Sequence, residues 1–153
     1  MTMDIITLNP FHAPAIALLH GGCFSHGWDE DAMSSLMGLP GTFGYAAIEE
    51  GEPMGFILGR AAADEFEVLT LCVLAQARRR GLASGLLSAA LNEARRRGAV
   101  RAWLEVAEDN PAAIAFYKKQ GFALSGRRPG YYAGNETRER TDALVYSRGL
   151  DGG

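Results

Sequence analysis

Apolar and polar residues follow the pattern of extended strands through the middle of the chain. Three such runs, 43–50, 53–63 and 66–74, are separated by short turns. Consecutive runs of this kind predict three antiparallel strands. Four further segments read as strands: 4–9, 100–107, 122–132 and 142–147. The run at 100–107 is apolar at all but two positions, which is typical of a central strand buried on both faces.

Four other segments carry helix signals. Pro14 suits a first helical turn in a segment that can end at Gly21, and residues 28–38 and 82–97 place their apolar side chains on one face. Asn110 can cap a fourth helix that ends before Gly121. The order of the elements is one strand, two helices, three strands, a helix, a strand, a helix and two strands. This order predicts an α+β domain around a mixed sheet.

Composition and charge narrow the class of protein. The chain has 153 residues, of which 48% are hydrophobic and 22% charged, as in a folded soluble domain. Its formal net charge of -3 provides no overall field for binding nucleic acid or an anionic membrane. No stretch is long enough to cross a bilayer. The chain has two cysteines, Cys23 and Cys72, and the second lies in an apolar run, so we expect no disulfide and a reduced, cytoplasmic protein.

The stretch QARRRGLASGLL, residues 76–87, is the first candidate for binding chemistry. A buried strand runs into a loop there, and the loop opens a helix at Gly81. Free backbone N–H groups and the helix dipole bind anions at such a place. Gly81 permits a positive φ or a close approach, and Ala83 is small. The alternative is a solvated turn of arginines that merely precedes a helix.

Two motifs resemble the GNAT superfamily of N-acetyltransferases. RRRGLA, residues 78–83, is similar to the family signature of Gln or Arg, two residues, Gly, one residue, then Gly or Ala. The stretch WLEVAEDNPAAIAFYKKQGF, residues 103–122, matches the recurrent Asn-x-x-Ala-x-x-x-Tyr-x-x-x-Gly-Phe. The chain departs from many members in lacking a proline after the cofactor strand. The resemblance implies a single N-acetyltransferase domain over residues 1–150, with a mixed, mostly antiparallel sheet flanked by about four helices.

The resemblance also implies acetyl-coenzyme A as co-substrate. In the family, backbone amides of the RRRGLA loop hold the pyrophosphate, and the strand at 71–73 supplies a donor to the developing oxyanion. The cofactor-binding residues it implies here are Leu71, Cys72, Val73, Arg78, Arg79, Arg80, Gly81, Leu82, Ala83, Ser84, Asn110 and Tyr117.

Five stretches carry a finer resemblance: CFSHGWDEDAM at 23–33, WLEV at 103–106, NPAAIAFY at 110–117, RRPGYY at 127–132 and TDALVYS at 141–147. Through them the chain resembles the RimI-type alanine N-acetyltransferases, which modify the N-terminus of a small-subunit ribosomal protein. This implies Glu105 as general base and Tyr117 as general acid. An α-amine has a pKa of about 8 and must lose a proton before it attacks a thioester. Glu105 lies in an apolar strand, where burial would raise its pKa, and Tyr117 can protonate the leaving thiolate. Alternatively, Glu105 is exposed or tied to an arginine, and Tyr117 is a core tyrosine.

Other readings stay open or are disfavoured. The acceptor can instead be a lysine side chain or a small-molecule amine, or the chain can be a non-catalytic acyl-coenzyme A sensor. His20, Cys23 and His26 are spaced in threes but lack a second cluster, so we expect no metal site, and Cys72 makes a poor nucleophile. Tyr131 and Tyr132 are candidates for the acceptor side. We expect no direct nucleic acid or membrane binding, and either a monomer or a homodimer.

Overall fold

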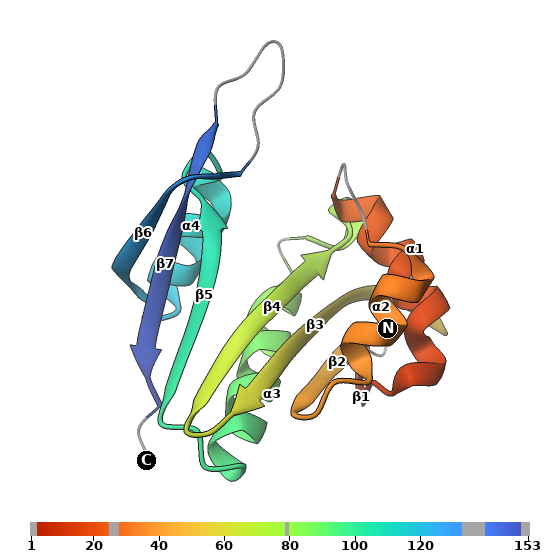
Figure 1. Ribbon diagram of the computed structural model, residues 1–153. Helices are drawn as coiled ribbons and strands as arrows, with labels where there is room; N and C mark the ends of the chain where they lie inside the picture. Colours follow the sequence, from red (N-terminus) through yellow and green to blue (C-terminus); the bar gives the residue numbers. More distant parts are fainter. Residues whose placement is uncertain (1–2, 25–27, 79, 133–139, 151–153) are drawn as a thin grey trace.

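The computed structural model describes residues 3–24, 28–78, 80–132 and 140–150. Within these ranges the chain forms seven strands and four α-helices (Figure 1). The strands are β1 (Met3–Thr7), β2 (Thr42–Glu49), β3 (Glu52–Ala62), β4 (Glu65–Val73), β5 (Arg101–Ala107), β6 (Ala123–Tyr132) and β7 (Thr141–Gly149). The helices are α1 (Ala13–Cys23), α2 (Glu30–Met37), α3 (Leu82–Arg96) and α4 (Pro111–Lys119). Each predicted strand and helix is present close to its expected bounds. The pattern did not predict two short 3-10 turns, Pro10–His12 and Ala75–Ala77.

The strands form one sheet in the order β1-β2-β3-β4-β5-β7-β6. Every neighbouring pair is antiparallel except β4 and β5, which run parallel. That parallel ladder has only three residue pairs, from Glu65 opposite Arg101 to Glu67 opposite Trp103. Beyond it the two strands diverge, and Figure 1 shows the sheet opening between them. The predicted fold class, an α+β domain around a mixed, mostly antiparallel sheet, is confirmed.

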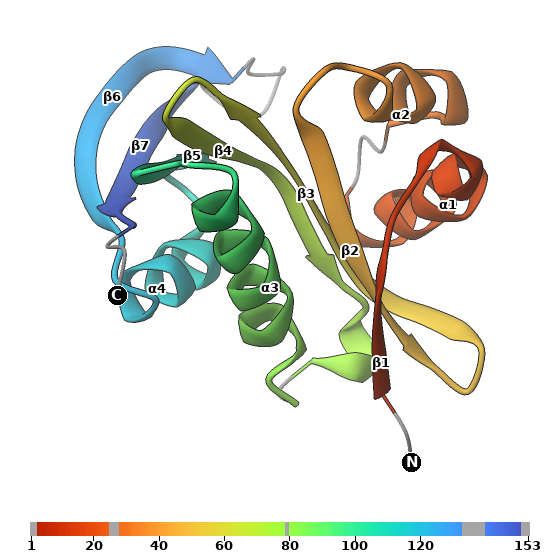
Figure 2. The ribbon, with the colours of Figure 1, turned by 90° about the horizontal axis from the view of Figure 1, so that it is seen from below.

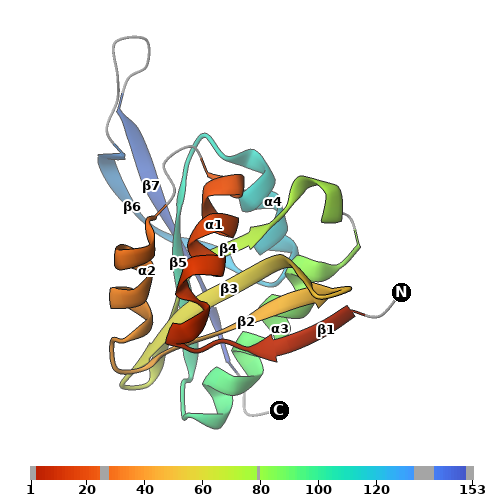
Figure 3. The same ribbon diagram turned by 90° about the vertical axis from the view of Figure 1, so that its right-hand side faces the viewer.

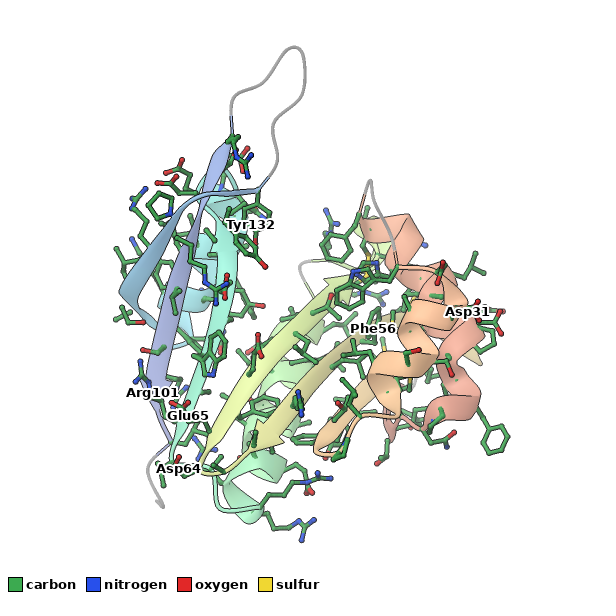
Figure 4. All side chains as sticks on the ribbon, in the orientation of Figure 1. Asp31, Phe56, Asp64, Glu65, Arg101 and Tyr132 are labelled. Carbon is green, nitrogen blue, oxygen red and sulfur yellow. A yellow bond between two sulfur atoms is a disulfide. The ribbon has the colours of Figure 1, made fainter. Side chains whose placement is uncertain are left out.

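Helices cover both faces of the sheet. α3 and α4 lie on one face, and α1 and α2 lie on the other over β2 to β4 (Figures 2 and 3). The predicted apolar stripe of α3 is buried against the sheet: Leu82, Leu86, Leu87, Ala90, Leu91 and Ala94. On the opposite face Phe56 of β3 is fully buried with α1 and α2 (Figure 4). In the described part of the chain no helix combines the length and apolar character needed to span a membrane.

A β-bulge in β4 changes which face its side chains occupy. Gly59 pairs with Val68 and Leu58 pairs with Thr70, so Leu69 is an extra residue in the ladder. Val68 therefore packs with the α3 side, whereas Cys72 packs with α1.

This change of face explains a disulfide that the sequence analysis did not expect. Cys72 is bonded to Cys23, in the last turn of α1, with 6.2 Å between their Cα atoms. This separation lies in the normal disulfide range. The expectation of unbonded cysteines was wrong because 49 residues separate the two, and only the bulge and the packing of α1 bring them together.

The expectation that β5 is buried on both faces was also wrong. Ala102, Leu104 and Val106 are buried, whereas the alternating residues Trp103 and Glu105 keep some exposure. α1 and α2 lie over β2 to β4 and leave this part of β5 uncovered (Figure 1). The uncovered face of β5 carries one of the predicted catalytic residues.

Candidate active site

A cavity of about 510 Å³ lies where β4 and β5 diverge. Five of the candidate cofactor, catalytic and acceptor residues line it: Leu71, Glu105, Asn110, Tyr117 and the acceptor-side candidate Tyr132. The other lining residues are His20, Phe24, Trp28, Val68, Leu69, Thr70, Leu104, Val106, Ala107 and Ala113. The cavity therefore joins both predicted catalytic side chains, which come from β5 and α4.

Glu105 presents one carboxylate oxygen to an ion pair and leaves the other without a partner. Its Oε1 lies 2.9 Å from Nη2 of Arg128 on β6, and its side chain is only 15% exposed. Its Oε2 is buried and has no hydrogen-bond partner among the described residues. A nearby carboxylate, Glu67, has its pKa raised by burial and by the negative charge of Glu105. Glu105 lines the same cavity as Tyr117, so its carboxylate is the candidate proton acceptor of the site.

Tyr117 is held by the core and by the start of its helix. Its ring packs edge-on against Phe116 and Phe122, with centroids 5.1 and 5.6 Å away. Asn110 caps the helix, since its side chain accepts the Ala113 N–H at 3.2 Å, as predicted. Burial raises the pKa of Tyr117 above its usual range. The hydroxyl therefore stays protonated and can act as a hydrogen-bond or proton donor.

The loop before α3 has the backbone geometry of an anion cradle. Gly81 is the N-cap of α3, has φ +76°, and provides no side-chain cap to the first turn. The backbone N–H groups of the first helical turn are therefore open to an outside acceptor. A Cβ built on Gly81 would meet no atom within 4 Å, so this side of the loop is open to a ligand. The residues present thus fit an anionic group such as a pyrophosphate.

The arginines of this loop are engaged with the protein itself. Arg78 donates its Nε–H to the carbonyl of Val73 at 3.0 Å. Arg80 makes a two-pronged ion pair with Glu49 on β2, with N–O distances of 2.6 and 3.2 Å. Arg79 lies outside the described residues. The charge of Arg80 is balanced by Glu49, so the backbone is the stronger anion-binding element of the loop.

The remaining predicted cofactor residues lie around this loop and not in the cavity lining. The side chain of Leu82 is buried in the core with that of Val73 packed against it. The Cys72 side chain is turned toward α1 by its disulfide, so only its backbone faces the divergence of the strands. Ala83 and Ser84 follow Gly81 in the first turn of α3.

Sequence reasoning missed an aromatic wall on the side of the cavity formed by α1 and the segment after it. His20, Phe24 and Trp28 line it, and Tyr132 lines the cavity from β6 (Figure 4 shows Tyr132). Phe24 and Trp28 are 40% and 36% exposed, which is high for large aromatic side chains. His20 shares the buried face of α1 with Ile16. The sequence analysis weighed His20 only in a weak metal pattern whose third residue, His26, lies outside the described part, and Phe24 and Trp28 only as letters of a family-like stretch. The alternative that Glu105 is tied to an arginine is confirmed: the partner is Arg128, which the sequence analysis did not name, and Tyr131 lies under its guanidinium.

Comparisons with known proteins agree with this geometry. The model of the acetyltransferase (GNAT) family matches residues 13–122. A [ribosomal protein bS18]-alanine N-acetyltransferase of Escherichia coli K12 is 28% identical over 141 residues, which cover 92% of this chain and 93% of that protein. An N-alpha-acetyltransferase RimI of Mycobacterium tuberculosis is 40% identical over 89 residues, covering 58% of this chain and 50% of that one.

Solved structures show the same fold. The crystal structure of the ribosomal-protein-S18-alanine N-acetyltransferase from Escherichia coli has a TM-score of 0.89 at 26% identity, covering 99% of this chain and 96% of that one. Arabidopsis thaliana NAA60 in complex with acetyl-CoA has a TM-score of 0.83 at 18% identity, covering 99% and 100%. The chain therefore belongs to the GNAT family of acetyltransferases and is an N-acetyltransferase whose acetyl donor is acetyl-coenzyme A.

Proposed function

We propose that this N-acetyltransferase acts on the N-terminal α-amine of a protein, and that its acceptor is a small-subunit ribosomal protein. The observation that carries the proposal is that Glu105, whose Oε2 has no hydrogen-bond partner among the described residues, and Tyr117 line the same cavity. The acceptor assignment is supported by the Escherichia coli relative, a bS18-alanine N-acetyltransferase that is similar over 92% of the chain. A ribosomal acceptor would place the enzyme in the cytoplasm.

The chemistry of the site favours an α-amine. At pH 7 roughly a tenth of an amine with a pKa of about 8 is already uncharged, against roughly one in a thousand or fewer for a lysine at about 10.4. Glu105 supplies one carboxylate, which is ion-paired with Arg128. Such a base deprotonates an α-amine more readily than a lysine, because the α-ammonium group has the lower pKa.

Each part of the site has a role in the proposed reaction. Acetyl-coenzyme A supplies the activated thioester. Glu105 removes the proton of the attacking amine, directly or through one water, and Tyr117 gives a proton to the leaving sulfur. The edge of β4 beyond Glu67 has no ladder partner on β5, and its N–H groups are the candidate donors to the developing oxyanion. The open first turn of α3 holds the pyrophosphate.

Two other functions make different predictions. A lysine or small-molecule acetyltransferase would use the same base and acid, so only acceptor preference separates it from our proposal. A non-catalytic acyl-coenzyme A sensor needs the Gly81 loop but has no use for a carboxylate and a tyrosine in one cavity.

The test measures acetyl transfer to a panel of acceptors, with the release of free coenzyme A thiol as the readout. The panel contains a peptide with a free N-terminal alanine, the same peptide with a blocked N-terminus and an internal lysine, and small amines. We expect release with the first peptide. Release only with the lysine peptide or small amines would refute the acceptor assignment. Tight acetyl-coenzyme A binding without any release would support the sensor.

The catalytic roles are tested with near-isosteric variants. Glu105→Gln and Tyr117→Phe should each lower kcat by at least about tenfold, while acetyl-coenzyme A affinity stays within about twofold. Glu65→Gln is the matched control for the carboxylate, since Glu65 is exposed at the start of β4, and Tyr45→Phe is the control for the phenol on β2. Full activity in Glu105→Gln would show that another group is the base.

A further inference from the structure

His20, in the last turn of α1, lies at the centre of the aromatic wall. Its side chain is 4% exposed, one of the few buried polar side chains among the described residues. The ring stacks on the Trp28 indole at 4.6 Å between centroids with 12° between planes, and touches Phe24 at 4.4 Å. Both aromatic neighbours line the cavity with Glu105. A buried histidine this close to a site needs a partner for its ring nitrogens.

The hydrogen bond of His20 identifies what the ring does. Nδ1 accepts the backbone N–H of Trp28 at 3.1 Å. An imidazole nitrogen accepts only when it carries no proton, so the ring is neutral with its proton on Nε2. Burial lowers the pKa of His20, which favours this neutral form. The contact joins two points eight residues apart, the end of α1 and the beginning of the segment that leads to α2.

We propose that His20 is a positioning residue for the acceptor: through Nδ1 it fixes the backbone at Trp28 and so holds the Trp28 and Phe24 side chains against the cavity. The inference rests on the proposed function, because it takes the aromatic wall, which lines the cavity together with Glu105, as the side that receives the acceptor amine. The donor is assigned to other elements, the loop at Gly81 and the edge of β4. His20 should therefore set acceptor affinity and leave the donor and the chemical step nearly unchanged.

Three substitutions separate the hydrogen bond from the ring. His20→Phe keeps an aromatic ring but removes the nitrogen that accepts the Trp28 N–H. His20→Asn puts an amide oxygen near the position of Nδ1, whereas His20→Gln puts its amide near the position of Nε2. Without Nδ1, the partly buried backbone N–H of Trp28 loses its hydrogen-bond partner. We expect the acceptor KM to rise about tenfold in His20→Phe and His20→Gln and less than about threefold in His20→Asn. In all three, kcat and the KM for acetyl-coenzyme A should stay within about twofold.

His12 supplies a matched control. Its Nδ1 accepts the Asn9 N–H at 3.0 Å, so it makes the same kind of bond outside the cavity lining. His12→Phe should leave the acceptor KM within about twofold. A comparable KM increase in His12→Phe would mean that the effect is one of general stability, and a loss in His20→Asn as large as that in His20→Phe would show that Nδ1 is not the group that matters. Either result overturns the proposal.

A second measurement does not depend on activity. The chain has two tryptophans, Trp28 and Trp103, so Trp103→Phe leaves Trp28 as the single tryptophan, whose emission can be excited selectively over that of the tyrosines. In that background His20→Phe should increase the quenching of Trp28 by acrylamide at least about twofold, and His20→Asn should change it little. Unchanged quenching in His20→Phe refutes the positioning role. Failure of the wild-type protein to acetylate any N-terminal peptide refutes the proposed function instead, so the two failures are distinguishable.

Discussion

Glu105 and Arg128 are joined at 2.9 Å although β7 lies between their two strands. Glu105 on β5 pairs with Val145, and Arg128 on β6 pairs with Ala143, so the guanidinium reaches across one strand to the carboxylate. The ion pair engages Oε1, and Oε2 has no hydrogen-bond partner among the described residues. Arg128 therefore acts as a positioning residue for the proposed base.

Removing Arg128 should lower the turnover of the enzyme. Arg128→Met leaves a nearly buried carboxylate without its counter-charge, so the orientation of Glu105 is no longer held. We expect kcat to fall about tenfold, or about 1.4 kcal/mol, with acetyl-coenzyme A affinity unchanged. Arg128→Lys should recover part of the loss. The control is Arg127→Met, because Arg127 pairs with Glu108 and Asp142 instead. An equal loss in both methionine variants would contradict the positioning role.

Gly81→Val should weaken acetyl-coenzyme A binding by at least about tenfold. The substitution puts a branched side chain at φ +76°, on the open side of the loop that the pyrophosphate would approach. Gly98→Val is matched, since Gly98 has φ +97°, is equally open, and lies just after the other end of α3. Isothermal calorimetry would compare the two. Normal binding by folded Gly81→Val would remove this loop from the donor site.

Reduction of the Cys23–Cys72 disulfide should destabilise the fold. The bond closes a loop with a sequence separation of 49 residues, for which the unfolded-chain entropy model gives about 4 kcal/mol, at the upper end of the usual range of about 2–4 kcal/mol. Urea unfolding with and without reductant measures the difference. A double variant, Cys23→Ser with Cys72→Ser, should show the reduced stability in both conditions. If the free energy of unfolding of the wild-type protein is the same with and without reductant, the disulfide does not contribute to stability.

Acid should remove the stabilisation that comes from the ion pairs of Glu93 with Arg96 and Arg97. Hydrogen bonds from Arg96 and Arg97 lower the pKa of Glu93 from 4.5 to about 2. Because the folded pKa is depressed, the stabilisation is complete above about pH 4.5 and is lost as the pH falls through about 2. Arg96 is 72% exposed, so solvent screening limits the effect to about 1 kcal/mol. Urea unfolding of Glu93→Gln should show this loss at pH 7 and a smaller difference from wild type at pH 3. An equal difference at both pH values would contradict the shift.

Much of the architecture was predictable because it depends on local signals. The alternation within β2 to β4, the apolar stripe of α3 and the Asn110 cap of α4 are properties of neighbouring residues, and the structure has all three. The expectation for β5 failed because burial depends on what lies over a strand. Its apolar sequence resembles that of a fully covered strand, yet α1 and α2 lie elsewhere on the sheet.

The residues of the candidate site were likewise predictable only in part. Glu105, Tyr117 and Gly81 could be named from two motifs, and their roles remain predictions for the experiments above. The aromatic wall and Arg128 could not be named, because which side chains face the cavity depends on how α1 and β6 pack against the rest of the sheet. His20 accepts the backbone N–H of Trp28, eight residues along the chain, and Arg128 meets Glu105 across β7.

The order of residues was enough to establish the elements, their sequence and the family, since periodicity, caps and short motifs act within a few positions. Tertiary structure alone decided three things: the divergence of β4 from β5, the face on which Cys72 lies, and the partners of Glu105 and His20. The physical reason is that a side chain's burial and charge partners depend on the packing of the whole chain. A single extra residue at Leu69 moves Cys72 to the α1 face.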